Sequence, residues 1–132
     1  MNPPNSTTRY LRRIILAAVL AFCFVALAAQ AETLALAHTY KAEGKNLDGS
    51  SYTGTVTLEL ISNTTFKITW KIGDTVTKGF GMRMNDAVSA TYMIDGAPGL
   101  VIYKVLPDGR FDGIWAIKGQ DGNGSETLTP VN

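Results

Sequence analysis

The chain has 132 residues, of which 12 are Lys or Arg, 11 are Asp or Glu and one is a cysteine, Cys23. The basic residues do not cluster after position 31, which argues against a nucleic-acid-binding protein, because such proteins need a basic face. Since Cys23 lies in an N-terminal apolar segment, the rest of the chain can contain no disulfide, thiol nucleophile or Cys-ligated zinc.

The first 31 residues have the three-part layout of a secretory signal peptide. Arg12 and Arg13 precede the uncharged run Ile14–Ala29, and the small-residue pattern Ala29-Gln30-Ala31 follows it. The run is 16 residues long, whereas a transmembrane helix needs about 20. We therefore expect cleavage after Ala31, no permanent membrane span after cleavage, and a mature protein that is periplasmic or secreted.

The mature chain would span residues 32–132. Cleavage would remove three of the twelve basic residues and none of the eleven acidic ones, which leaves a net charge of −2. A chain of about a hundred residues can bury one hydrophobic core. The sequence thus predicts two parts, the signal peptide at 1–31 and a single domain at 32–132.

Apolar residues in this domain recur with a period of two. The segments "YTGTVTLELI" and "TFKITWKI" alternate apolar with polar or charged residues, as strands with one buried face do. Turn sequences rich in Gly, Asn and Asp separate the runs at intervals of about 8 to 12 residues. The strands that we expect are 40–44, 52–61, 65–72, 75–83, 87–94, 100–105, 111–118 and 125–129. This pattern predicts an all-β fold, a small antiparallel meander of about eight strands closed as an up-and-down barrel, because closure removes exposed edges.

The turn Pro107-Asp108-Gly109 fixes the register of one predicted hairpin. A three-residue loop sets Leu106 opposite Arg110, which places Tyr103 opposite Gly113 on one face. The other face then sets Lys104 opposite Asp112, an opposite charge. An aromatic ring over a glycine fills the gap left by the missing side chain, so this register is chemically consistent.

Two further hairpins follow the same reasoning. A loop at Ser62-Asn63-Thr64 sets Leu58 opposite Ile68 and Val56 opposite Trp70. A two-residue turn at Gly73-Asp74 places Gly79 and Gly81 inside and turns Val76 and Phe80 outward, which avoids burying Lys78. The residues that we expect in the core are Phe66, Trp70, Phe111 and Trp115.

Residues that could carry out chemistry are few. His38 is the single histidine and lies near the start of the predicted domain, so no Ser-His-Asp arrangement is expected. Six aspartates lie in predicted turns, and turn formation explains them. The stretch "DGNGSE" begins like a calcium loop but has Glu126 where such a loop requires glycine. We therefore predict no catalytic residue, no metal site and no cofactor.

The hairpin around Pro107 has apolar residues on its outer face as well. A solvated strand normally alternates, so four adjacent outward apolar side chains indicate an interaction site, the outer apolar patch. Its residues are Leu100, Ile102, Ile114 and Ala116. The partner would be an unknown protein or a second copy of the chain. In an alternative interpretation, the segment Thr33–Thr39 folds over these residues.

Several stretches together resemble a family of short exported bacterial β-proteins of unknown function. They are "DGSSYTGTVTLE", "FKITWKIG", Gly79-x-Gly81, "GLVIYKVLPDGRFDGIWA" and "GNGSETLTP". Some members of that family are loosely labelled fibronectin-binding. The resemblance implies an exported protein with an adhesion-related role, and it implies no particular site residue.

Three classes of function remain open from the sequence. The first is an exported, non-enzymatic binding or interaction module. The second is a small-ligand-binding barrel of lipocalin-like or avidin-like type, which would need a cavity. Against this class, four large aromatics point inward, and a barrel of eight strands has room only for side chains or one small ligand. An enzyme is the third and least favoured class.

Overall fold

The computed structural model describes residues 35–132, and the expected signal peptide at residues 1–31 lies outside the described residues. Eight strands run through the described part of the chain. They are β1 (Thr39–Lys45), β2 (Ser51–Leu60), β3 (Thr65–Ile72), β4 (Thr75–Met84), β5 (Ala87–Ile94), β6 (Ala97–Val105), β7 (Phe111–Ile117) and β8 (Gly124–Pro130). The described residues include no helix with the length and apolar character needed to cross a membrane.

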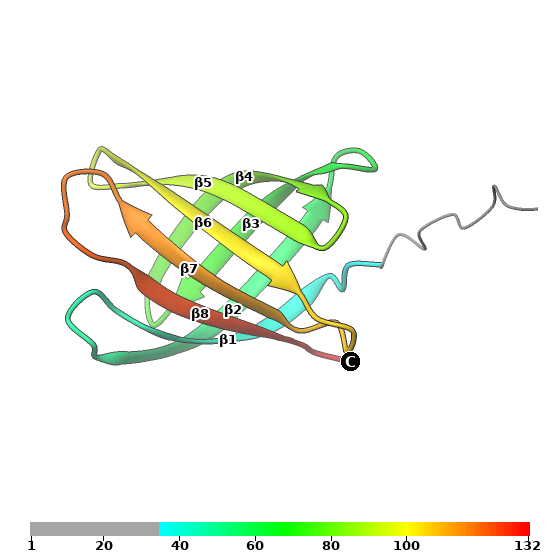
Figure 1. Cartoon of the computed structure of the whole chain (residues 1–132), viewed down its shortest axis with the longest axis horizontal. Coiled ribbons are helices and arrows are strands. Elements are labelled where there is room, and N and C mark those ends of the chain that lie inside the picture. Colours follow the sequence, from blue (N-terminus) through cyan, green and yellow to red (C-terminus); the bar gives the residue numbers. More distant parts are fainter. Residues whose placement is uncertain (1–34) are drawn as a thin grey trace, which may run out of the picture. The chain divides into compact units, whose positions relative to one another are not determined.

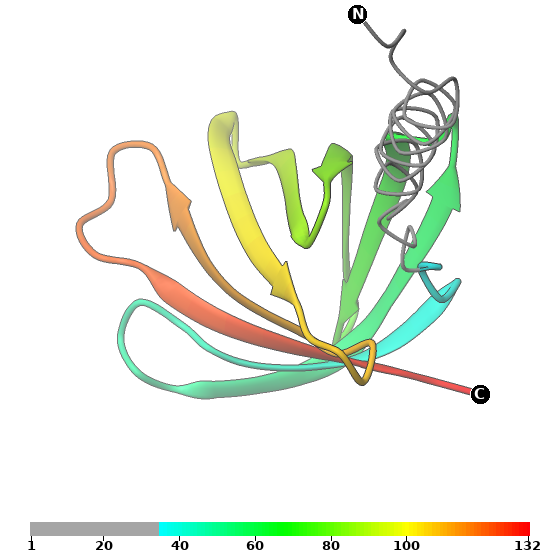
Figure 2. The same cartoon turned by 45° about the vertical axis from the view of Figure 1, so that its right-hand side comes forward.

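The strands form an antiparallel meander that closes on itself. Each strand pairs with the next one in the chain, and β8 pairs with β1. Figures 1 and 2 show the resulting barrel from two directions. The predicted all-β fold, the strand number and the closure are confirmed.

The predicted registers are also confirmed. Tyr103 pairs with Gly113, and Val56 pairs with Trp70. The Gly73-Asp74 turn sets Gly79 opposite Ile68, as expected. Short turns account for this agreement: Gly73 and Gly109 have positive φ, 57° and 85°, the left-handed backbone conformation that these hairpin turns need.

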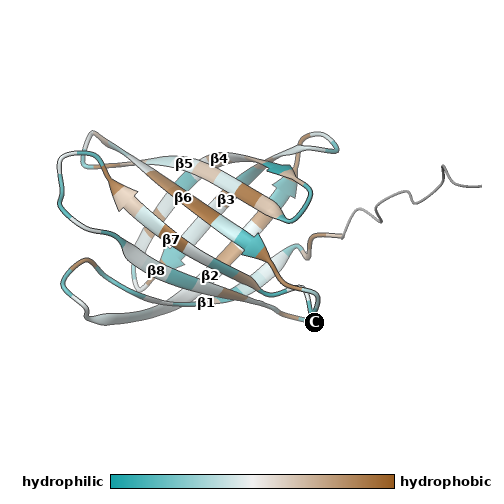
Figure 3. Cartoon of the chain, viewed as in Figure 1, coloured by the Kyte–Doolittle hydropathy of each residue, from teal (hydrophilic) through white to brown (hydrophobic). Residues whose placement is uncertain are grey.

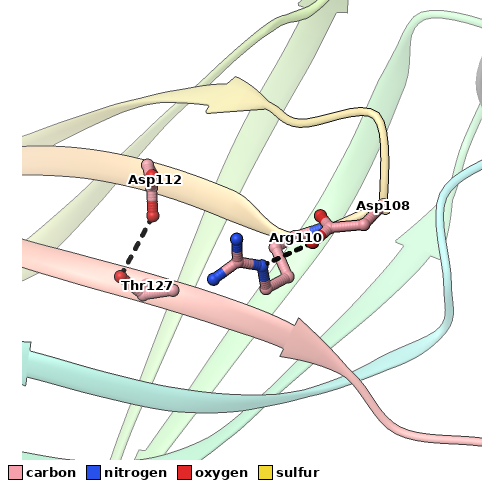
Figure 4. Close-up of polar contacts among 4 residues, drawn as sticks. All are labelled: Asp108, Arg110, Asp112 and Thr127. Carbon is pink, nitrogen blue, oxygen red and sulfur yellow. Dashed lines mark hydrogen bonds and ion pairs between the residues drawn. The ribbon is translucent and has the colours of Figure 1, made fainter.

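The predicted pairing of Lys104 with Asp112 on the outer face is confirmed, and the hydrogen bond of Asp112 comes from a different strand. Lys104 and Asp112 are register partners, but Asp112 Oδ1 accepts a hydrogen bond from Thr127 Oγ1 at 3.1 Å (Figure 4). Thr127 is the β8 partner of Asp112 on its other side. Within a sheet each residue has two cross-strand neighbours, and the hairpin alone shows only one of them.

The two ends of the barrel are filled differently. We call the end with the loops after β2, β4 and β6 the packed end. There the centroid of the Phe111 ring lies 4.9 Å from the ring centroid of Tyr40 and 5.6 Å from that of Tyr103. Phe66 is fully buried. Leu36 and Ala37 pack against this core, and the Ala37 N–H donates to the Tyr40 hydroxyl at 2.8 Å.

The opposite end, with the loops after β1, β3, β5 and β7, is the open end. Figure 1 shows the loops after β1, β5 and β7 together on the left and the C-terminus at the other end. Of the four aromatics expected in the core, Phe66, Phe111 and Trp70 are buried. Trp115 is partly buried and packs against the core from the open end.

Candidate functional site

A cavity of about 250 Å³ opens at the open end of the barrel. Aromatic rings from five strands line it, together with threonine and aliphatic side chains and one carboxylate, that of Glu126. The rings are those of Tyr52, Trp70, Tyr92, Tyr103 and Trp115. An apolar pocket with a few convergent polar groups has the general character of a small-ligand site.

Glu126 lies on β8 and is 4% exposed. Its Oε1 accepts hydrogen bonds from the Tyr103 hydroxyl and from Trp70 Nε1, the latter at 3.0 Å. Its Oε2 accepts one from the Tyr52 hydroxyl at 2.9 Å. An indole N–H can only donate, so Trp70 Nε1 needs an acceptor, and Glu126 Oε1 is that acceptor.

A second tryptophan orients the Tyr52 hydroxyl. Trp115 Nε1 donates to the Tyr52 hydroxyl oxygen at 3.1 Å, and Tyr52 in turn donates to Glu126. This chain of donors runs from β7 through β2 to β8. In the described residues no buried side-chain nitrogen or oxygen lacks a hydrogen-bond partner. The polar network is thus complete, which is the condition under which buried polar groups rigidify a structure.

The environment keeps the tyrosines of the cavity protonated. Burial is the main cause that raises the pKa of Tyr103 well above its usual value, and the negative charge of Glu126 adds to it. The same two causes raise the pKa of Tyr52 far above the usual range and that of Tyr92 to about 12. These phenols therefore remain hydrogen-bond donors at neutral pH.

Glycines determine where the cavity rings lie. In five cross-strand pairs a glycine faces an aromatic residue whose ring occupies the place of a Cβ, and four of these aromatics line the cavity. The pairs are Gly44–Tyr52, Gly81–Phe66, Gly99–Tyr92, Gly113–Tyr103 and Gly124–Trp115. A Cβ added at any of these glycines would collide with the facing ring. The missing side chain leaves the space that the facing ring occupies.

The outer apolar patch lies on the outside of the barrel, away from the cavity. Leu100, Ile102 and Ile114 are 57%, 52% and 52% exposed, and Ala116 is exposed as well. The register places Leu100 beside Ala116 and Ile102 beside Ile114. In Figure 3 the ribbons of β6 and β7 carry brown, hydrophobic segments next to each other. A broad surface hollow of about 560 Å³ includes Ile102 and Ile114 in its lining.

The N-terminal segment does not cover this patch in the described residues. Leu36 and Ala37 pack against the barrel core, and Leu100, Ile102 and Ile114 stay more than half exposed. The remaining part of the predicted cover, residues 33 and 34, lies outside the described residues.

The other candidate residues of the sequence have structural positions. His38 is exposed, and its carbonyl oxygen accepts the Leu58 N–H. The turn role of the aspartates is confirmed at Asp48 and Asp108, which accept the N–H of Ser50 and Arg110 two residues later (Figure 4 shows the Asp108 loop). The hydroxyl and then the N–H of Ser50 lower the pKa of the Asp48 carboxyl, and the N–H and then the guanidinium of Arg110 lower that of Asp108. In the described residues no three His, Cys, Asp or Glu side chains form a metal-binding group.

Sequence reasoning missed Glu126 as a site residue. The signal was present: in "GSETLTP" the residues Gly124, Glu126 and Leu128 share one face by strand alternation. Since Leu128 must be buried, Glu126 must point inward as well. A charged residue on the buried face of a strand is the exception that indicates a functional position.

Comparisons with known proteins indicate the fold alone. No protein-family model matches the chain, and no curated protein matches it. Solved structures of designed barrels are similar. A redesigned β-barrel is 19% identical, with a TM-score of 0.54 over 74% of this chain and 92% of that one. A de novo designed fluorescence-activating β-barrel is 18% identical, with a TM-score of 0.56 over 76% and 98%. A barrel bound to DFHBI is 15% identical, with a TM-score of 0.52 over 73% and 94%.

Proposed function

We propose that the protein is an exported, non-enzymatic binding protein that holds a small ligand in the cavity at the open end. The observation that carries the proposal is the cavity itself, about 250 Å³ in volume, lined by aromatic rings around the buried carboxylate of Glu126. Four neutral donors orient the polar groups before any ligand arrives, so little ordering has to occur on binding.

The similar designed barrels support this proposal. One is described as fluorescence-activating and another is bound to DFHBI, and both share the barrel fold of this chain. Of the classes left open by the sequence, the small-ligand barrel is therefore the one that we favour. The inward aromatics do not fill the whole interior, because a cavity of about 250 Å³ remains at the open end, where Trp70 and Trp115 line it.

The test uses a matched pair of variants. Thr77 faces the interior opposite Trp70 and lines the cavity, so Thr77→Phe should fill part of it. Thr55 is exposed on the outer face of β2, and Thr55→Phe adds the same ring outside the barrel. A fragment library is screened by the fluorescence of Trp70 and Trp115, and hits are measured by calorimetry. The proposal is supported by hits that bind the Thr55→Phe variant as tightly as the unaltered protein and the Thr77→Phe variant at least about tenfold more weakly. A tenfold change in Kd corresponds to about 1.4 kcal/mol of binding free energy. Hits that bind both variants equally place the site elsewhere and overturn it.

Export is part of the same proposal. It is supported by the sequence of residues 1–31, with Arg12 and Arg13 before the apolar run and Ala29-Gln30-Ala31 after it. The protein recovered from the cell envelope or medium should begin at Glu32. Intact-mass measurement decides this, and a mass that retains residues 1–31 would contradict it.

The outer apolar patch supports a second candidate function, self-association through a second copy of the chain. The observation in its favour is the exposure of Leu100, Ile102 and Ile114 on neighbouring strands. Size-exclusion chromatography with light scattering on residues 32–132 tests it. A monomer at all accessible concentrations would rule out this second function and leave the ligand proposal intact.

A further inference from the structure

The charge of the cavity is the starting point for the chemistry of its ligand. Among the described residues that line the cavity, Glu126 alone carries a charge. Its three hydrogen-bond donors are two phenols and an indole, all neutral, so these bonds leave the negative charge in place. A carboxylate has about four acceptor positions, and three are used here, which leaves one on Oε2 for a further donor.

The rings around this carboxylate, like its negative charge, favour a ligand that carries a positive charge. The rings of Trp70 and Tyr92 meet edge to face with centroids 5.3 Å apart, and those of Tyr52 and Trp115 do so at 6.5 Å. Aromatic faces attract cations through the ring quadrupole, and cages of several rings are a known means of recognising ammonium groups. A bare metal ion would instead need several oxygen ligands.

The loops around the mouth add negative charge. Alternate loops of a meander lie at the same end, and those of the open end contain four aspartates and one lysine, Lys118. The aspartates are Asp48, Asp74, Asp95 and Asp121. The loops of the packed end contain Asp86, Asp108 and Arg110. Lys45 and Lys71 lie in the strands near the open end, and Lys45 Nζ donates to Ser51 Oγ at 2.6 Å. A mouth with excess negative charge raises the local concentration of cations.

We propose that the ligand is a small organic cation whose ammonium group lies among the rings of Tyr52, Trp70, Tyr92 and Trp115, close to the Glu126 carboxylate. This inference rests on the proposed function and names its ligand class. An ammonium bearing N–H groups would donate to the remaining acceptor position on Glu126 Oε2. A quaternary ammonium would be held by charge and by the ring faces alone.

The experiment compares probes of one shape and three charges. Choline, the neutral isostere 3,3-dimethylbutanol and the anion 3,3-dimethylbutanoate are titrated into residues 32–132, followed by calorimetry and by the fluorescence of Trp70 and Trp115. We expect choline to bind at least about tenfold more tightly than the alcohol and the anion to bind most weakly. Because only the ligand changes, this comparison does not depend on the folding of any variant.

A variant locates the effect within the cavity. Glu126→Gln keeps an acceptor oxygen for Trp70 and Tyr103 and removes the charge, and circular dichroism checks that it folds. Choline should lose at least about tenfold in affinity for this variant, whereas the alcohol should change little. If Glu126→Gln does not fold, the Thr77→Phe variant replaces it, and choline should then lose affinity relative to Thr55→Phe.

The outcomes separate this inference from the proposed function. If the neutral alcohol binds as tightly as choline, with Thr77→Phe weakening both, the cavity binds ligands but the cation inference is wrong. If choline fails to bind at millimolar concentrations, the cation inference is also wrong, and the fragment screen alone decides the proposed function. Choline binding that is unchanged in Glu126→Gln contradicts the role of the carboxylate.

Discussion

The packed end and the open end share eight strands and differ in what their inward positions hold. At the packed end, rings contact rings: Phe111 lies against Tyr40 and Tyr103, and Leu36 and Ala37 add to the core. At the open end, rings point their polar atoms at Glu126 and leave a cavity of about 250 Å³. Strand number limits the interior of a barrel, while the side chains at each end decide whether it is filled.

The two ends also differ in how the burial of their side chains contributes to the free energy of folding. Burial of apolar rings at the packed end contributes directly to stability, at about 25 cal/mol for each Å² removed from water. Burial of the Glu126 carboxylate is costly, and its hydrogen bonds compensate for the loss of water only if all are made. The network of Tyr52, Trp70 and Tyr103 provides them. We interpret the packed end as the part of the barrel that stabilises the fold. The stable fold in turn holds the residues of the open end in position.

The largest expected effect comes from truncating one ring at each end. Phe111 is fully buried, so Phe111→Ala should lower the free energy of unfolding by about 4 kcal/mol through the cavity that it leaves. Trp115 borders an existing cavity and is partly buried, so Trp115→Ala should cost about 2 kcal/mol. Urea unfolding of both variants checks this. Equal losses would mean that the two ends are packed alike.

The border between the two regions is tested at Gly113, which faces Tyr103. A Cβ at this position would meet the Tyr103 ring and come within 2.7 Å of the Ile102 carbonyl oxygen. Gly113→Val should therefore destabilise the protein by about 3 kcal/mol. Asp112→Ala, the neighbouring control, removes one exposed hydrogen bond from Thr127 and should cost about 0.5 kcal/mol or less. Similar urea midpoints for the two variants would contradict the assigned role of the glycine.

High pH should distinguish Tyr103, which is hydrogen-bonded to Glu126, from Tyr40 at the packed end. The pKa of Tyr103 is raised well above 10.0, mainly by burial and then by the charge of Glu126. Below pH 10 the phenol is protonated in both the folded and the unfolded chain, so its contribution to stability is fully present. Above pH 10 the unfolded chain loses the proton and the folded chain keeps it, so the free energy of unfolding falls by up to about 1.4 kcal/mol per pH unit for this residue.

Matched variants test this assignment. Tyr103→Phe should make the decline in stability between pH 10 and 11 shallower, whatever it does at neutral pH. Tyr40→Phe should change the decline less, because the Ala37 N–H and the charge of Arg83 both lower the pKa of Tyr40 against the effect of burial. Urea midpoints at the two pH values measure both slopes. A larger change for Tyr40→Phe would reverse the assignment.

The smallest effect on stability is expected outside the barrel. Ile102 is 52% exposed, so Ile102→Lys should alter the free energy of unfolding by about 1 kcal/mol or less. Val76→Lys is a matched control, because Val76 is an exposed apolar residue on β4. If the outer apolar patch mediates self-association, only the Ile102 variant should abolish it in light scattering. Unfolding of Ile102→Lys would show that the patch belongs to the core.

Much of the fold could be predicted because its determinants are local. Strand positions follow from alternation, as in "FKITWKI", and hairpin registers follow from turns such as Pro107-Asp108-Gly109, whose geometry depends on a few adjacent residues. The hydrogen bond from Thr127 to Asp112 could not be predicted in the same way. Thr127 reaches Asp112 from β8, and that neighbour exists only once the sheet is assembled.

The sequence by itself therefore determined the strands and the registers of three hairpins, since these depend on a period of two and on turn chemistry. Only the tertiary structure decided what those side chains meet. Closure of β8 onto β1 brings Glu126 to Tyr52, 74 residues away in the chain, and to Trp70. Closure also arranges the alternate loops of each end in a ring. The cavity depends on these long-range contacts, and no local pattern specifies which side chains share an interior or how much of it they leave empty.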